Sequence, residues 1–224
     1  MRTLEVNCGG VIIGGGRPVV VQTMCNTHTY DIEETVAQCR RMAAAGAEII
    51  RITVPGLREV EDISAIKSRL RAEGIGTPLV ADIHFSSETA IAVAPVVEKV
   101  RINPGNFHRD HGQARLQFAR LIEVCKENGT AIRIGLNHGS LGEYITNLYG
   151  NTPFAMAKAA MEWIDMCIEA GFYQVVVSLK SSNTVTMVEA YRQLAAMMQE
   201  RGVVFPMHVG VTEAGNGDSG RIKS

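Results

Sequence analysis

The sequence predicts an α/β fold: a TIM-type (βα)8 barrel, incomplete at its C-terminal end, with about seven βα units and a short β-hairpin in front. Aliphatic runs of strand length recur mostly every ~20–30 residues, which is the size of one βα unit. Alternating helices and strands indicate a parallel sheet. Seven units exceed the five or six usual in open doubly wound sheets, so the barrel is favoured. The strands are expected near Val20, Arg51, Val80, Arg101, Arg133, Val176 and Val209.

Each element carries a local signal. Residues 6–13, around a pair of glycines, predict the hairpin. Asp31 followed by Glu34 is typical of an N-cap and capping box, which would open a helix that ends before Gly46. Apolar stripes at helical spacing predict further helices, for example Val60, Ile63, Ile66 and Leu70, or Tyr191, Leu194, Ala195 and Met198. Glycines expected just past helices are Gly46, Gly74, Gly129, Gly171 and Gly202.

Composition excludes several classes of protein. The 224 residues carry 22 Lys and Arg against 23 Asp and Glu, a net charge of −1, which argues against a nucleic-acid-binding protein. No apolar run approaches the ~18 residues of a membrane span, and no secretory signal is visible at the start. The five cysteines are scattered without a C-x-x-C pair, which indicates a reduced, cytoplasmic setting. We expect no metal site, because His108 and His111 share a charged, solvated loop.

Basic residues stand where barrel strands should be apolar. Arg51, Arg101 and Arg133 each lie between aliphatic residues. Successive strand residues alternate between the lumen and the helix layer, so outward-facing aliphatic side chains leave the arginines facing the lumen. The same alternation predicts the other inward-facing polar residues of the strands, Asp82, His84, Asn103, Ser178 and Lys180, and Glu213 just past the last strand could point to the same mouth.

This arrangement indicates an anion-binding site. Four cations (Arg51, Arg101, Arg133 and Lys180) face two acids (Asp82 and Glu213), a surplus of about two positive charges. Unpaired buried charge costs several kcal/mol, so the surplus should be hydrated or matched by an anionic ligand. Guanidinium groups suit phosphate oxygens, and enzymes with this fold work at the C-terminal ends of the strands. Internal salt bridges in a structural core are the alternative.

A glycine-rich segment near the end fits G-x-G-x-x-G over residues 215–220. A dinucleotide fingerprint belongs to a first βα unit with an acidic residue ~20 positions further on, so NAD is not expected. A flexible phosphate-binding loop after a late strand is still compatible with this segment.

These residues lie in segments that resemble the hydroxymethylbutenyl diphosphate synthases, iron–sulfur reductases of the methylerythritol phosphate route to isoprenoids. The Asn137-His138-Gly139-Ser140-Leu141 form is similar to the longer, three-domain branch. The matching segments are Val21–Met24, Ile50–Val54, Pro78–Phe85, Val100–Asn106, Arg133–Gly135, Asn137–Ser140 and Gly210–Gly215.

The resemblance implies reductive opening of 2-C-methyl-D-erythritol 2,4-cyclodiphosphate to 4-hydroxy-3-methylbut-2-enyl diphosphate. It implies that residues 1–224 form a truncated substrate-binding barrel, with an insert domain and a C-terminal iron–sulfur domain absent from the chain. The family's [4Fe–4S] cluster uses cysteines and a glutamate outside this sequence, so the fragment alone is expected to be inactive. Ferredoxin or flavodoxin would donate electrons, and the full-length protein is expected to be a homodimer. The implied residues are Arg51, Arg101, Arg133 and Lys180 for the diphosphate, Asn137, Asp82 and His84 around the substrate, and Glu213 as the catalytic acid.

Two other functions fit the residues. Lys180 could be the Schiff-base amine of a barrel lyase or aldolase that acts on a phosphorylated substrate. The chain could also be a non-catalytic anion-binding or assembly domain.

Overall fold

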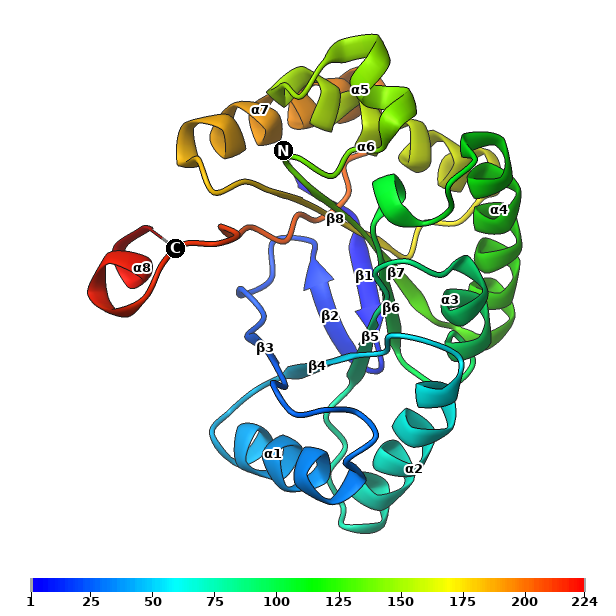
Figure 1. The fold of residues 1–224 in the computed structure, drawn as a ribbon, viewed down its shortest axis with the longest axis vertical. Helices are drawn as coiled ribbons and strands as arrows, with labels where there is room; N and C mark the ends of the chain where they lie inside the picture. The colour runs from blue at the N-terminus through cyan, green and yellow to red at the C-terminus, as the bar shows by residue number, and fades with distance from the viewer. Residues whose placement is uncertain (1, 224) are drawn as a thin grey trace.

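A curled, parallel sheet of six strands forms the centre of the computed structural model, which describes residues 2–223 (Figure 1). The strands follow one another in chain order, because each βα unit adds its strand beside the previous one. A separate antiparallel hairpin precedes them, as predicted. The hairpin strands are β1 (Glu5–Cys8) and β2 (Val11–Gly14), and the sheet strands are β3 (Gln22–Met24), β4 (Ile49–Thr53), β5 (Leu79–Asp82), β6 (Lys99–Ile102), β7 (Ala131–Asn137) and β8 (Val175–Lys180).

Helices cover the outer, convex side of this sheet, except for the C-terminal helix, which stands apart from the others (Figure 1). None of the helices within residues 2–223 is both long and apolar enough to cross a membrane. Their bounds are α1 (Ile32–Ala44), α2 (Arg58–Ala72), α3 (Ser87–Val93), the 3-10 helix η1 (Pro104–Asn106), α4 (His111–Asn128), α5 (Glu143–Tyr149), α6 (Pro153–Glu169), α7 (Thr184–Glu200) and α8 (Gly217–Lys223).

The predicted helix boundaries are confirmed where the sequence carries capping signals. The Asp31 side chain accepts a hydrogen bond from the backbone N–H of Glu34 and so caps α1. The Asp31 N–H donates to the carbonyl of His28, so the return bond of a capping box is not formed. All five glycines predicted to follow helices have a positive φ, between +65° and +93°.

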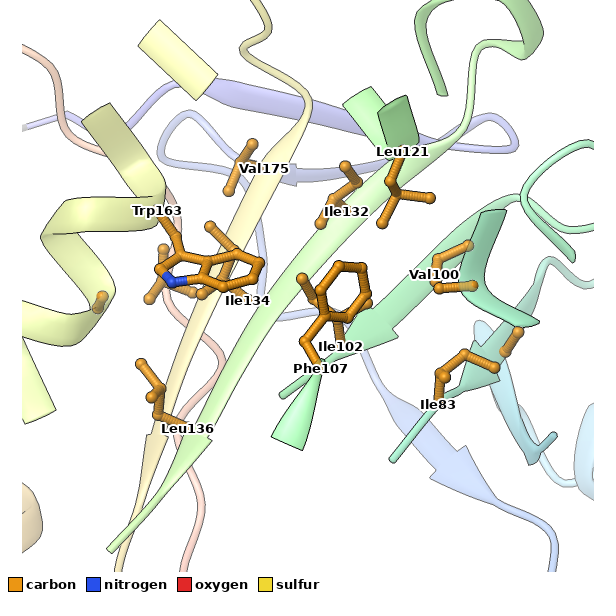
Figure 2. Close-up of a cluster of buried hydrophobic side chains, with 14 of the residues drawn as sticks. Ile83, Val100, Ile102, Phe107, Leu121, Ile132, Ile134, Leu136, Trp163 and Val175 are labelled. Carbon is orange, nitrogen blue, oxygen red and sulfur yellow. The ribbon is translucent and has the colours of Figure 1, made fainter. Parts of the chain in front are cut away.

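The main core lies between the sheet and the helices (Figure 2). Outward-facing strand residues such as Ile132 and Ile134 are fully buried against α4 and α6. Trp163 of α6 packs against Phe118 of α4 with ring centroids 4.4 Å apart, and both rings contact Phe107. Every second residue of β4 to β8 is aliphatic and is buried in this apolar layer. The residues that alternate with them therefore face the lumen.

The hairpin lies inside the curve of the sheet and closes the N-terminal end of the lumen (Figure 1). Its buried Val6 packs with Ala131 and Val176, and its buried Cys8 packs with Ile49 and Val80. These strand residues stand at or near the first positions of their strands. The hairpin therefore covers the inner face of the sheet at the N-terminal ends of these strands.

Both edges of the sheet depart from the prediction. The first strand begins at Gln22, later than expected around Val20, because the N–H of Val21 donates to the Glu48 carboxylate over 2.7 Å. The last predicted strand is reduced to an isolated bridge between Met207 and Val177. A cavity of about 540 Å³ lies on this flank, between residues 17–22 and residues 206–209. The described sheet is therefore a half-barrel that does not close on itself.

Candidate functional site

The alternation predicted from the strands is confirmed by the register of the sheet. Asp82 pairs with Arg101, and Arg101 pairs with Arg133, so these three side chains extend from the same face of β5, β6 and β7. Their aliphatic neighbours in each strand belong to the outer core. Arg51 of β4 pairs with Val80, which lies two residues before Asp82 on the same face of β5. The arginines of β4, β6 and β7 therefore converge on the lumen.

Asp82 is the shared counter-ion of this cluster. Its carboxylate lies 3.1 Å from Nη1 of Arg101, 3.6 Å from Nε of Arg51 and 3.1 Å from Nε2 of His84. Burial alone raises the pKa of the Asp82 carboxyl, but the hydrogen bond with His84 and the charges of Arg101, Arg51 and Arg133 outweigh it. The pKa of Asp82 therefore lies well below its usual range, and the carboxylate stays ionised.

Arg133 is buried without an acidic partner. Arg133 is only 1% exposed, and its guanidinium group forms no ion pair among residues 2–223. Its Nη1 lies 3.3 Å from Nδ1 of His208, and its Nε has no hydrogen-bond partner in the described part of the chain. Burial and the neighbouring charges of Arg51 and Arg101 lower the pKa of Arg133 to about 9. An anion would supply the missing partner.

Arg51 and Lys180 complete the predicted set of cations. Arg51 directs Nε toward the Met24 thioether over 3.1 Å as well as toward Asp82. Lys180 ends β8 and makes no hydrogen bond or ion pair with its ammonium group among the described residues. Burial, followed by the charges of Arg133, Arg51 and Arg101, lowers the pKa of Lys180 to about 8.

Two lumen residues were missed by the sequence prediction. Lys99 is 1% exposed at the start of β6, two residues before Arg101, and its ammonium has no acidic partner in the described structure. Burial is the main reason that the pKa of Lys99 falls to about 8. The strand alternation would have found Lys99, because it shares the parity of Arg101. The same alternation also points to His208, which lies between Met207 and Val209 in the last predicted strand, although that strand forms only one bridge in the structure.

The lumen is therefore more basic than the sequence indicates. Five basic side chains face it, with Asp82 as their one carboxylate among the described residues. When all are ionised the surplus is four positive charges, against the two expected. The five are Arg51, Lys99, Arg101, Arg133 and Lys180.

Two loops meet at the C-terminal mouth of the lumen. The Asn103 side chain donates to Oγ of Ser140 over 3.1 Å and accepts from the N–H of Gly105. Gly105 lies so close to the second loop that a Cβ there would stand 2.1 Å from the Ser140 carbonyl oxygen. The loop after β6 thus braces the turn that follows Asn137, the last residue of β7. The predicted role of Asn137 beside the substrate stays a prediction.

Glu213 is not joined to the cluster. It is exposed, has a left-handed φ of 52°, and forms no hydrogen bond or ion pair among residues 2–223. Its role as the catalytic acid stays a prediction.

The sequence matches the family model described as the GcpE TIM-barrel domain over residues 3–224. The chain belongs to this family. The match spans the hairpin, the sheet and every strand that contributes to the basic lumen of this GcpE barrel.

Curated relatives of the GcpE barrel carry the name 4-hydroxy-3-methylbut-2-en-1-yl diphosphate synthase (flavodoxin). The protein from Bacteroides fragilis is 45% identical over all of this chain, which spans 38% of that relative. Those from Leptospira interrogans and Chlamydia trachomatis are 43% and 42% identical, again over the whole chain, which spans 36% and 40% of their lengths. The chain thus spans about two fifths of the curated relatives that it matches.

Solved structures share the fold of the GcpE barrel at low identity. A type I 3-dehydroquinate dehydratase from Clostridium difficile has a TM-score of 0.65 at 10% identity, covering 95% of this chain and 82% of that chain. An N-acetylneuraminic acid synthetase from Leptospira borgpetersenii has a TM-score of 0.60 at 14% identity, covering 96% and 72%. At these identities the likeness concerns the fold alone.

The cysteines of the GcpE barrel do not form a cluster site. Cys25 and Cys39 lie with their sulfurs 3.5 Å apart, and all five cysteines are buried. Within residues 2–223, no group of three or more His, Cys, Asp or Glu side chains could hold a metal ion. The described residues therefore do not fit a [4Fe–4S] cluster.

Proposed function

We propose that this chain is the substrate-binding barrel of an enzyme that reductively opens 2-C-methyl-D-erythritol 2,4-cyclodiphosphate to 4-hydroxy-3-methylbut-2-enyl diphosphate. The observation that carries the proposal is the lumen of five cations around one carboxylate in a member of the GcpE family. The cyclic diphosphate, with one ionised oxygen on each phosphorus, would neutralise about half of this surplus charge. The names of the relatives, which match the whole chain, support 4-hydroxy-3-methylbut-2-en-1-yl diphosphate as the product, and the cyclic diphosphate is the substrate that the sequence resemblance implies.

In this proposal Arg51, Arg101, Arg133 and Lys180 hold the diphosphate. Arg133 and Arg101 each have a buried Nε without a hydrogen-bond partner in the described structure, and these donors are available to phosphate oxygens. Arg101 is braced by Asp82 and by the Gly135 carbonyl, 3.2 Å from its Nη2, so binding need not reorganise it. Asn137, Asp82 and His84 would line the substrate carbons at the mouth.

The chemistry takes up two electrons and two protons. The bond between a ring carbon and the phosphate oxygen breaks, a hydroxyl leaves as water, and a carbon–carbon double bond forms. The cations would stabilise the negative charge left on the phosphate oxygen as it departs from carbon. Glu213 is proposed as the proton donor, which requires its exposed loop to move toward the substrate.

The electrons must enter from outside the described residues. We propose that a [4Fe–4S] cluster lies in a C-terminal domain of a longer protein, with an inserted domain between it and the barrel. The relatives' names support flavodoxin as the donor, with ferredoxin as the other candidate. The proposed enzyme is cytoplasmic and forms a homodimer.

Calorimetry with the cyclic diphosphate tests this function. The wild-type chain should bind it, and Arg133→Ala should bind it at least tenfold more weakly, because a buried charge-assisted contact is lost. Arg115→Ala, which removes a surface ion pair with Glu162, is the matched control and should bind like the wild type. Absence of binding to the wild type would refute the proposal.

One observation favours a second candidate, a Schiff-base lyase that acts on a phosphorylated substrate. Lys180 lies at the C-terminal end of β8 and has a lowered pKa of about 8. A larger fraction of its amine is therefore neutral and nucleophilic at neutral pH than in an ordinary lysine. If this candidate is right, borohydride would reduce the imine between Lys180 and a phosphorylated carbonyl substrate and so attach the substrate covalently to Lys180. The reductase proposal predicts no such adduct.

A further inference from the structure

Arg133 contacts an imidazole where a buried arginine usually contacts a carboxylate. Nη1 lies 3.3 Å from Nδ1 and 3.4 Å from Nε2 of His208, across 75 residues of sequence. Asp82, the carboxylate of the cluster, makes its ion pairs with Arg101 and Arg51 instead. His208 therefore holds the most buried guanidinium of the site without cancelling its charge.

The backbone of His208 is itself held firmly. Its N–H donates to the Val177 carbonyl over 2.8 Å, and its carbonyl accepts from the Tyr191 hydroxyl over 2.6 Å. The same hydroxyl accepts from the N–H of Leu179 in β8 over 2.9 Å. Tyr191 thus ties His208 to β8 at the point where the last predicted strand stops pairing with the sheet.

The surroundings of His208 keep its ring neutral. Arg133 on β7, Lys180 on β8, Lys99 on β6 and Arg51 on β4 all lie near it. Burial first, and then these four positive charges, lower the pKa of His208 to about 2. A neutral imidazole keeps one nitrogen lone pair, which can accept the hydrogen bond that Arg133 donates.

We propose that His208 is a positioning residue of the anion site, which orients Arg133 through its neutral ring so that the guanidinium's other donors face a bound phosphate group. A carboxylate in this place would fix the arginine equally well but would compete with the anion for its charge. The inference deepens the proposed function and rests on it for the identity of the substrate. His208 would orient Arg133 in the same way toward any ligand that carries a phosphate group.

The test compares two substitutions at His208 by calorimetry with inorganic pyrophosphate. His208→Gln keeps an acceptor and should bind within about threefold of the wild type. His208→Phe fills the space without an acceptor and should bind about tenfold more weakly. His111→Phe, which replaces a histidine paired with Glu162 on α6, is the control and should bind like the wild type.

A double-mutant cycle separates orientation from packing. If His208 acts through Arg133, then His208→Phe should weaken binding little further in an Arg133→Ala background. An equal loss in both backgrounds, or no loss from His208→Phe in the wild type, would overturn the inference.

A spectroscopic readout covers the case in which His208→Phe does not fold. The 15N chemical shifts of the wild-type His208 ring should stay those of a neutral imidazole from pH 8 to pH 5, and a titration near pH 6.5 would overturn the inference. The substrate proposal can fail separately: the cyclic diphosphate would not bind, while the pyrophosphate results would still hold.

Discussion

Asp82 and Arg101 are register partners on β5 and β6, and their side chains meet with Oδ1 and Nη1 3.1 Å apart. Through its other oxygen, Asp82 also approaches Arg51 and His84. One carboxylate therefore offsets several of the charges that would otherwise repel one another inside the barrel. Removing this carboxylate should therefore destabilise the whole cluster of cations.

We expect Asp82→Asn to lower the free energy of unfolding by about 3 kcal/mol, because it leaves buried cations without their counter-ion. Pyrophosphate should raise the melting temperature of this variant more than that of the wild type, since the anion replaces the lost charge. Thermal unfolding with and without pyrophosphate measures both effects. Asp165→Asn, at a partly exposed ion pair with Arg201, is the control and should cost less than about 1 kcal/mol. Equal stability of the two variants would contradict the prediction.

Lys99 should destabilise the ligand-free chain at neutral pH. Its pKa in the folded state is about 8, against 10.5 for an ordinary lysine, so the unfolded chain binds the proton more tightly. Stability should therefore rise as pH increases from about 8 to 10.5. Lys99→Met should be more stable than the wild type at pH 7, by about 3 kcal/mol, and should lose part of this rise.

Urea unfolding at several pH values tests the role of Lys99. Lys126→Met, at a surface pair with Glu123, is the control and should keep the pH dependence of the wild type. A Lys99→Met variant that is less stable than the wild type at pH 7 would show that Lys99 stabilises the fold in some other way.

Gly105→Ala should disrupt the mouth of the lumen. The added Cβ would lie 2.1 Å from the Ser140 carbonyl oxygen, so the two loops must separate. We expect a loss of about 2 kcal/mol of stability, together with weaker pyrophosphate binding. Gly76→Ala, where no atom lies within 4 Å of the new Cβ, is the matched control. Calorimetry and thermal unfolding of both variants would decide, and similar values for the two would refute the prediction.

Pyrophosphate affinity should fall as the pH rises above about 8. Lys180 and Lys99 both have a pKa of about 8 in the ligand-free protein, and each loses its positive charge above that value. The affinity can fall by up to about tenfold per pH unit for each proton lost. Lys180→Arg should keep its charge and show a shallower decline. Calorimetry from pH 6.5 to 9.5 measures both curves, and a flat wild-type curve would argue against a charged Lys180 at the site.

The inward set of polar strand residues could be predicted because it depends on alternation within each strand. Arg101 faces the lumen since Val100 and Ile102 must enter the apolar layer, and this holds for Arg51 and Arg133 in the same way. The positions of Glu213 and of the last strand could not be predicted so well. Both lie beyond β8, where no further strand among the described residues pairs with the chain to hold it.

The sequence by itself determined the parallel βα order, the helix ends and the face on which each charged strand residue lies, because these follow from the periodicity and capping of neighbouring residues. Only the tertiary structure decided which cations share the carboxylate of Asp82, that Lys99 is buried, and that His208 meets Arg133. Such pairings depend on distances between strands and segments far apart in the chain, and a local pattern does not encode those distances.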